Sequence, residues 1–385
     1  MTFIEEVGSS IGPILAVFAA AALLAAILTP LIRRVVLRHR IVDRPNARRV
    51  NTRPIPRAGG LAIAAAFLIV AGGFVLLNEG AGWVPTPLNL APGDFLALFL
   101  GGAAAAALGA IDDLFNLRAR WQLAGQIGLA LLAVALGIGI VVINNPFADA
   151  PIRFVEPFSV GFTVFWIVGM MNSINWIDGL DGLSTGIALI ASVTLGLISL
   201  TTQVSQPLVA VLCFALAGAL AGFLRWNFHP AKIFSGTSGV QFVGYTLAVL
   251  SILGSAKVAV ALLVLGVPII DTFWIIVGRL TRGVSPFAPD RSHIHHRLLD
   301  LGMSHRNTVL VIYGICAALG VLALLVSEIT TLYAFLGVFI VSGLILFAPT
   351  RGAFRRPEEL EAAAYETPDP DETPDPDETP GRDDV

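Results

Sequence analysis

The sequence predicts an all-α, polytopic membrane protein, and three observations carry that prediction. Only 13% of the 385 residues are charged and 56% are hydrophobic, with a mean hydropathy of +0.80. Soluble domains contain about 25% charged residues. Eleven apolar runs each approach the length of about 20 residues that a membrane helix needs. Lysine and arginine gather in alternate connections between these runs, which is the pattern that orients membrane helices.

The predicted membrane helices have ends that are uncertain by several residues. They cover residues 11–32, 59–77, 94–111, 123–143, 158–177, 183–200, 207–224, 238–254, 256–277, 308–327 and 331–348. The eighth and ninth are hard to separate, since almost nothing lies between them. No basic residue precedes the first run, so we interpret it as a retained helix rather than a cleaved signal peptide.

The basic residues also predict the orientation of the chain. With the N-terminus outside, every lysine and arginine except Arg153 and Lys257 falls in an inner segment. These segments are 33–58, 112–122, 225–237, 278–307 and 349–385. We therefore expect an N-out, C-in topology. The polar motifs fall at the same inner ends, so chemistry is expected at the cytoplasmic face of the cell membrane.

The chain divides into an expected membrane domain, residues 1–350, and a cytoplasmic tail, residues 351–385. The tail repeats Thr-Pro-Asp-Pro-Asp-Glu at 367–372 and 373–378. Acidic, proline-rich sequence has little to bury, so we expect it to be disordered. Cys213 and Cys316 lie in apolar runs and are expected to be buried, free thiols.

The most informative stretch is polar and lies between two apolar runs, at residues 172–182. Polar side chains recur there at every third position: Asn172, Asn175, Asp178 and Asp181. Each step of three turns an ideal helix by about 300°, so neighbours share a face while the series drifts. Gly179 and Gly182 can break the helix and turn the later carboxylates back. A polar loop is the alternative, but ionisable groups at membrane depth favour a functional site.

Two further clusters lie at predicted inner helix ends. Asp112 and Asp113 are adjacent acids, which repel unless a proton or a cation lies between them; a solvated helix end is the alternative. The second cluster combines imidazoles with guanidinium groups: His293, His295, His296, Arg291 and Arg297. Histidines alone suggest a transition metal, but the arginines favour phosphate. An amphipathic surface helix is the alternative there.

Two loops complete the inner surface. The first contains Arg48 and Arg57, which the positive-inside bias alone would explain, together with prolines and glycines that indicate a shaped turn. The second, Ser235–Gly239, precedes an apolar run and offers backbone N–H groups to a phosphate, although such composition is also common in loops. Carboxylates for a divalent cation and basic groups for phosphates together favour phosphoryl transfer from a soluble donor to an acceptor within the membrane.

These motifs, in this order, resemble the polyprenyl-phosphate N-acetylhexosamine-1-phosphate transferases. The resemblance runs from about Asp43 to Leu299 and favours the WecA/TagO-like branch over MraY. It is carried by the first loop, by the aspartate pair with two residues that follow it, and by the 172–183 segment. The first-loop residues are Asp43, Pro45, Arg48, Pro54, Pro56, Arg57, Gly59 and Gly60, and the second group is Asp112, Asp113, Leu117 and Gln126. Asp271, Arg279, residues 283–287 and the histidine cluster also match. The 172–183 segment is the most specific of them.

The resemblance implies transfer of a sugar 1-phosphate, most simply N-acetylglucosamine 1-phosphate, from a UDP-N-acetylhexosamine to polyprenyl phosphate, releasing UMP. It implies Mg²⁺, or Mn²⁺ in its place, and a role in initiating cell-envelope glycopolymers. The implied catalytic residues are Asp112, Asp113, Asp178 and His295. Implied substrate-binding residues are Arg48, Arg57, Asn172, Asp181, Lys232, Arg291, His293 and His296. Implied metal ligands are Asn175, Asp178 and Thr237.

The sequence departs from the family pattern most clearly at Thr237, where the family carries a metal-binding aspartate. A threonine hydroxyl can ligate Mg²⁺ but brings no charge. Asn51, Arg49 and Gln122 replace a histidine and two lysines. A transporter or flippase, and a catalytically silent membrane scaffold, remain alternative functions. No nucleic-acid partner is expected, and a homodimer is left open.

Overall fold

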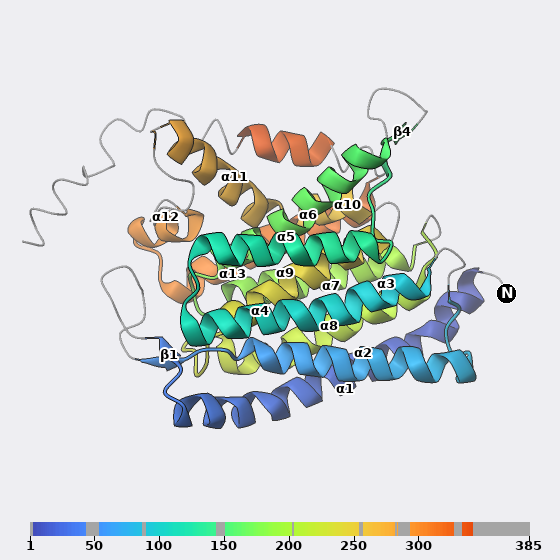
Figure 1. Ribbon diagram of the computed structural model, residues 1–385, viewed down its shortest axis with the longest axis horizontal. Coiled ribbons are helices and arrows are strands. Elements are labelled where there is room, and N and C mark those ends of the chain that lie inside the picture. The colour runs from blue at the N-terminus through green and yellow to red at the C-terminus, as the bar shows by residue number, and fades with distance from the viewer. Residues whose placement is uncertain are drawn as a thin grey trace, which may run out of the picture. The chain divides into compact units, whose positions relative to one another are not determined.

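The computed structural model describes residues 3–43, 54–86, 90–143, 151–201, 204–253, 257–281, 283, 293–326 and 333–341. Helices dominate these residues and confirm the all-α class (Figure 1). They are α1 (Phe3–Arg38), α2 (Gly60–Ala81), α3 (Pro92–Leu96), the π-helical η1 (Ala97–Gly101), α4 (Gly102–Phe115), α5 (Ala119–Ala135), α6 (Glu156–Ile177), α7 (Leu183–Ser199), α8 (Pro207–Asn227), α9 (Gly236–Leu253), α10 (Lys257–Val264), α11 (Gly266–Thr281), α12 (Ile294–Asp300) and α13 (His305–Leu325). Residues 333–341 are also helical.

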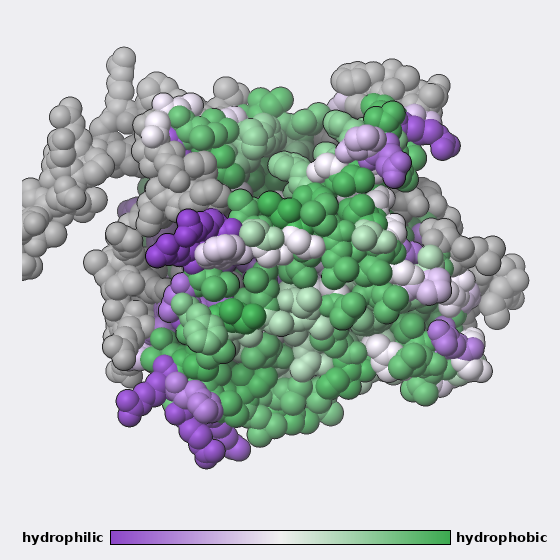
Figure 2. Space-filling view, in the orientation of Figure 1, coloured by the Kyte–Doolittle hydropathy of each residue, from purple (hydrophilic) through white to green (hydrophobic). Residues whose placement is uncertain are grey.

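The helices form a bundle whose interior is filled by apolar side chains, α8 and α9 being the most deeply enclosed. Among the described residues, seven helical segments are long and apolar enough to cross a membrane. They are 10–38, 60–81, 92–115, 156–177, 207–227, 236–253 and 305–325. The bent pair α10–α11 can provide an eighth. Apolar residues cover the middle of the face in Figure 2, with hydrophilic residues gathered toward its ends. The chain is therefore a polytopic membrane protein, and the predicted count of eleven is not confirmed.

Two predicted helices differ from the observed structure for local reasons. The predicted helix 123–143 ends at Ala135, and β3 (Val142–Ile143) pairs antiparallel with β4 (Ile152–Arg153). Gly137 adopts φ +112°, and the run that follows is rich in β-branched residues, which favour strands. The predicted helix 256–277 is broken, because α10 and α11 meet at 78°. Pro268 explains the break, since its ring clashes with the carbonyl four residues earlier, at Val264.

Helices α2, α4 and α9 approach closely because glycines line their contacts. A Cβ on Gly60 would lie 1.9 Å from the Gly239 Cα, and one on Gly109 would lie 2.3 Å from the Thr237 carbonyl oxygen. The short hairpin β1 (Val42–Asp43) and β2 (Ile55–Pro56) precedes α2. The N–H groups of Gly59 and Gly60 donate to the carbonyls of Phe234 and Ser235. The shaped turn expected after α1 is thus bonded to the α8–α9 loop.

The buried, free cysteines are as predicted: Cys213 and Cys316 are both fully enclosed. The predicted tail, 351–385, lies outside the described residues, as do Arg48 and Arg291.

Candidate active site

Five separated segments of the chain line one cavity of about 280 Å³. Its carboxylates are Asp43, Asp113, Asp178 and Asp181, and its other polar lining includes Arg57, Asn175, Asn227, Thr237, His296 and His305. We call this space the carboxylate cavity. It joins the first loop, the end of α4, the α6–α7 turn, the start of α9 and the α12–α13 region. In Figure 1 the ends of these elements near β1 and α12 lie at the same end of the bundle. The expectation that the polar motifs share one end of the helices agrees with this arrangement.

The aspartate pair is bonded to the first turn of α9. The backbone N–H groups of Thr237 and Ser238 donate to the two oxygens of Asp113, at 2.9 and 3.0 Å. The Thr237 hydroxyl donates to Asp112 Oδ2 at 2.6 Å, while Leu117 N–H donates to Asp112 Oδ1 at 2.8 Å. A carboxylate at a helix N-terminus is stabilised by free N–H groups and by the helix dipole. The two acids therefore hold different positions: Asp113 lines the cavity, and Asp112 bonds Thr237 and the α4–α5 turn.

The start of α9 differs from the phosphate cradle considered for Ser235–Gly239. Two N–H groups of its first turn donate to Asp113, so the carboxylate of Asp113 occupies the place that a phosphate would take. Gly236 makes the approach possible: its φ is +71°, and a Cβ there would lie 2.6 Å from both Ala58 N and Asp113 Oδ2.

Arg57, in the first loop, bonds the end of α4 beside Asp113. Its Nη2 donates to the Asp113 carbonyl at 2.6 Å and to Asn116 Oδ1 at 2.9 Å. These bonds hold the guanidinium beside the Asp113 backbone, at the edge of the cavity.

The α6–α7 turn breaks the helix as the glycines predict. α6 ends at Ile177, and α7 begins after Gly182, whose φ is +79°. The turn brings Asp178 and Asp181 into the cavity with Asn175. The Ser184 hydroxyl donates to Asp178 Oδ1. Burial, followed by the charges of Asp113 and Asp181, raises the pKa of Asp178 to about 6.

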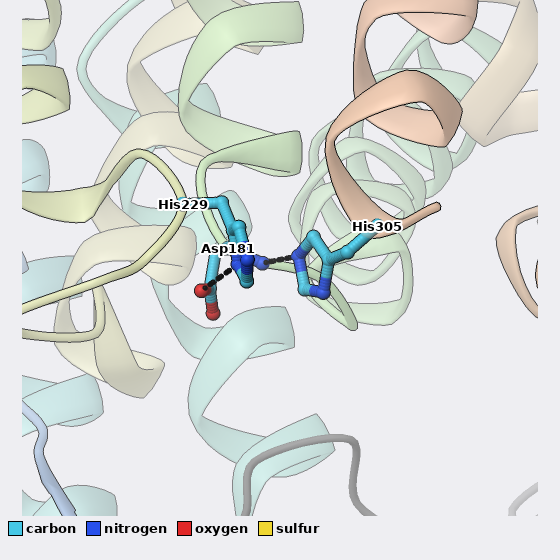
Figure 3. A group of neighbouring side chains, drawn as sticks. All are labelled: Asp181, His229 and His305. Carbon is cyan, nitrogen blue, oxygen red and sulfur yellow. Dashed lines mark hydrogen bonds and ion pairs between the residues drawn. The ribbon is translucent and has the colours of Figure 1, made fainter. Parts of the chain in front are cut away.

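Asp181 joins two histidines at the rim of the cavity (Figure 3). Its Oδ2 lies 2.8 Å from His229 Nδ1 and accepts the Ala231 N–H at 3.0 Å. Its own backbone N–H donates to His305 Nε2 at 2.9 Å. The two imidazole rings stack with centroids 4.3 Å apart.

The histidine cluster lies around the start of α12, held by α11. Asp271 accepts from the Ile294 N–H at 2.9 Å and lies 2.7 Å from His293 Nδ1. His295 is 1% exposed, and within the described residues neither of its ring nitrogens has a hydrogen-bond partner. Burial and the neighbouring His296 and His293 lower the pKa of His295 to about 2, so its imidazole is neutral. A Cβ on Gly179 would lie 2.2 Å from His295 Nε2, so that glycine makes room for the ring.

Five predicted site residues within the described part of the chain do not line the cavity: Asp112, Asn172, Lys232, His293 and His295. Asn172 Nδ2 donates to Gln126 Oε1 at 2.7 Å, and Gln126 Nε2 donates to Gln241 Oε1 at 3.1 Å. We call these three residues of α5, α6 and α9 the carboxamide ladder. Lys232 places its ammonium 5.3 Å from the centre of the Trp226 ring.

Three residues of this site were not given a role from the sequence: Asp43, which belongs to the first-loop motif, and His229 and His305. Asp43 and His305 line the cavity, and His229 bonds Asp181. All three lie in predicted inner segments, within or next to motifs that were identified. Position at an inner helix end is therefore the signal that could have found them.

The cavity suits a hard divalent cation. Its four carboxylates face one space, and burial, followed by the charges of Asp113 and Asp181, raises the pKa of Asp178. Mg²⁺ prefers oxygen ligands of this kind. Asp178, Asn175 and Thr237 could all contribute oxygen atoms from the lining.

Comparison with known proteins shows to which family the chain belongs. Residues 95–255 match the model of glycosyl transferase family 4. A probable undecaprenyl-phosphate N-acetylglucosaminyl 1-phosphate transferase of Bacillus subtilis is 35% identical over 345 residues, 87% of this chain and 90% of the relative. The chain belongs to this family. It is a membrane phosphotransferase.

Two more relatives extend the similarity. A decaprenyl-phosphate N-acetylglucosaminephosphotransferase of Mycobacterium tuberculosis is 32% identical over 86% of this chain and 87% of its own length. An undecaprenyl-phosphate alpha-N-acetylglucosaminyl 1-phosphate transferase of Yersinia pestis is 28% identical over 77% and 80%, respectively. The family resemblance drawn from the motifs is confirmed.

Proposed function

We propose that the protein transfers N-acetylglucosamine 1-phosphate from UDP-N-acetylglucosamine to a polyprenyl phosphate, releasing UMP, as the first step of cell-envelope glycopolymer synthesis. The main support is a cavity with four carboxylates at one end of a bundle of membrane helices. The relatives of the chain are named for this transfer. The relatives give no support to a transporter or a scaffold.

In the proposed reaction, an oxygen of the lipid phosphate attacks the β-phosphorus of the nucleotide sugar. A new P–O bond forms to the lipid, and the bond between the β-phosphorus and the bridging oxygen breaks. The α-phosphate leaves as UMP. Phosphoryl transfer of this kind depends mainly on positioning and on stabilisation of negative charge.

The chain's own residues divide the work. Asp113 faces the cavity from a fixed position and would orient the lipid phosphate, or take its proton. Asp112 would act as a positioning residue through Thr237. Arg57, His296 and Asp181 would bind the donor, together with Arg48, Arg291 and His293. His295, a buried neutral imidazole with free nitrogens among the described residues, would bond the donor beside the α6–α7 turn.

Mg²⁺ would be held by Asp178, Asn175 and the Thr237 hydroxyl. When bound, it supplies positive charge beside the pyrophosphate. The Thr237 hydroxyl donates its proton to Asp112, which leaves its oxygen lone pairs available to a cation. We further propose that this end of the bundle faces the cytoplasm, because the basic inner segments and the cavity motifs coincide.

Purified protein in lipid vesicles tests the proposal. UMP release is measured from a panel of UDP-sugars, with and without added polyprenyl phosphate, in Mg²⁺, in Mn²⁺ and after chelation. We expect release from UDP-N-acetylglucosamine that requires both lipid and divalent cation. Release without lipid, or none with any sugar, would contradict the proposed reaction.

A further inference from the structure

One cluster at the rim of the carboxylate cavity differs in chemistry from the rest of the lining. Asp181, His229 and His305 come from the α6–α7 turn, the α8–α9 loop and the start of α13 (Figure 3). Each offers one ligand atom, and these atoms all lie within 4.8 Å of one another. The other carboxylates of the cavity have no comparable pair of imidazoles within the described residues.

The geometry points to a second metal site, one for a borderline transition ion such as Zn²⁺, formed by Asp181, His229 and His305. Mg²⁺ takes oxygen ligands, whereas two imidazole nitrogens and one carboxylate oxygen suit zinc. Zinc sites with three protein ligands keep a fourth position open for water or another ligand. Here that position would open toward the cavity, since Asp181 and His305 both line it.

The distances permit closure around an ion. Zn–N and Zn–O bonds of about 2.0–2.2 Å place tetrahedral ligand atoms about 3.3 Å apart. The Asp181 and His229 atoms are already 2.8 Å apart, so they need only open slightly. The His229 side chain is 40% exposed, which leaves it room to rotate.

The proton positions also suit metal binding. His305 Nε2 accepts the Asp181 backbone N–H, so this nitrogen carries no proton and its lone pair can bind a metal. Metal binding would replace that hydrogen bond with a metal–nitrogen bond and leave the backbone N–H to donate to solvent in the cavity. The proton between His229 Nδ1 and Asp181 Oδ2 moves to His229 Nε2, leaving Nδ1 to bind. No co-reactant other than water is required, because one N–H bond of His229 breaks, another forms with the same proton, and otherwise only hydrogen bonds and metal–ligand bonds change.

The consequence rests on the proposed function. An ion at this cluster would engage Asp181, which we assign to donor binding, and would link three segments at the cavity rim. Zn²⁺ is therefore expected to compete with the nucleotide sugar, while Mg²⁺ does not displace Zn²⁺ from the cluster.

Calorimetric titration of Zn²⁺ into the purified full chain, without nucleotide or lipid, tests the site by a readout independent of turnover. We expect one ion per chain, and His229→Gln, His305→Gln and Asp181→Asn should each weaken binding by at least about tenfold. His39→Gln is the matched control, because that histidine is exposed at the end of α1; it should bind zinc as the wild type does. Thermal unfolding without zinc verifies that each variant is folded. If His305→Gln does not fold, His229→Gln alone tests the site, because His229 is exposed and its substitution should not disturb the fold.

Three outcomes would overturn the assignment. The first is that the wild type binds no Zn²⁺, and the second is that His229→Gln and His305→Gln bind it unchanged. The third is that His293→Gln alone abolishes binding, which would assign the ion to the histidine cluster of α12. Because nucleotide is absent, these results stand whether or not the chain transfers sugar phosphate.

Discussion

The carboxamide ladder and the carboxylate cavity are both polar regions set among apolar helices, but they handle burial differently. In the ladder, neutral side chains of Gln126, Asn172 and Gln241 bond one another across three helices. In the cavity, charged groups surround a space, and the pKa of Asp178 is raised to about 6 by burial and by its acidic neighbours. The first arrangement holds neutral amides together without an ion, although Gln241 Nε2 has no hydrogen-bond partner within the described residues. The second favours binding of a cation or a cationic group.

This comparison separates residues that one sequence pattern had joined. Asn172 and Asp178 belong to the same series of every third residue, yet one holds helices together and the other faces the cavity. Mutations should therefore affect stability in one region and chemistry in the other.

The largest effect is expected for the aspartate pair. Asp113→Asn and Asp112→Asn should each reduce turnover by about 10²–10⁴-fold, because a group acting on the reacting phosphate is lost or displaced. Asp113→Asn should be the more severe, since Asp112 acts through Thr237. UMP release measures turnover, and Asp300→Asn, an exposed acid of α12, is the control. Near-wild-type turnover in both variants would remove the pair from the mechanism.

Gly179→Ala should lower kcat/KM by roughly 10–100-fold. Its Cβ would lie 2.2 Å from His295 Nε2, and a displacement of about 1 Å in a catalytic group can cost 10²-fold. Gly169→Ala, in α6 before the α6–α7 turn, is the control, because nothing lies within 4 Å of its added Cβ. Equal activity of the two alanine variants would show that the His295 position is not needed.

Thr237→Asp should strengthen Mg²⁺ binding to the donor-free protein by at least about tenfold. The new carboxylate would face Asp112, now 2.6 Å from the Thr237 hydroxyl, and adjacent acids favour a cation between them. Wild type should bind Mg²⁺ weakly until the nucleotide sugar is added. Calorimetry measures both, with Thr237→Asn as the uncharged control. Tight binding to the donor-free wild type would contradict this expectation.

The smallest effect is expected in the ladder. Gln126→Leu leaves Gln241 without its partner and removes one bond of Asn172. Hydrogen bonds between membrane helices contribute about 0.6–1.7 kcal/mol, so Tm should fall by a few degrees. Gln122→Leu, one turn earlier on α5, is the matched control in the thermal unfolding measurement. An unchanged Tm in Gln126→Leu would mean that the ladder holds nothing in place.

Much of the fold and of the site follows from the sequence because length, hydropathy and basic residues act locally. The ends of α6 and α7 fall within two residues of the prediction, since Gly179 and Gly182 mark the break. The end of α5 and the α10–α11 bend were not predicted, because an apolar run does not distinguish strand from helix, or a straight helix from a bent one. Hydrogen-bond partners could not be predicted from the sequence either. Nothing in Ser235–Gly239 indicates that the N–H groups of Thr237 and Ser238 donate to Asp113.

The measurement that tests the account most directly compares Asp178→Asn with Gln126→Leu for single-turnover UMP release and for Tm. We expect Asp178→Asn to lose at least about 100-fold in turnover at pH 7.5. Its Tm should hold or rise. Because the pKa of Asp178 is raised in the folded state, ionisation of this carboxyl destabilises the folded protein as the pH rises through about 6, and asparagine removes that charge. Gln126→Leu should lose Tm and keep most of its turnover. If Asp178→Asn turned over like the wild type, the cavity could not be the site of transfer.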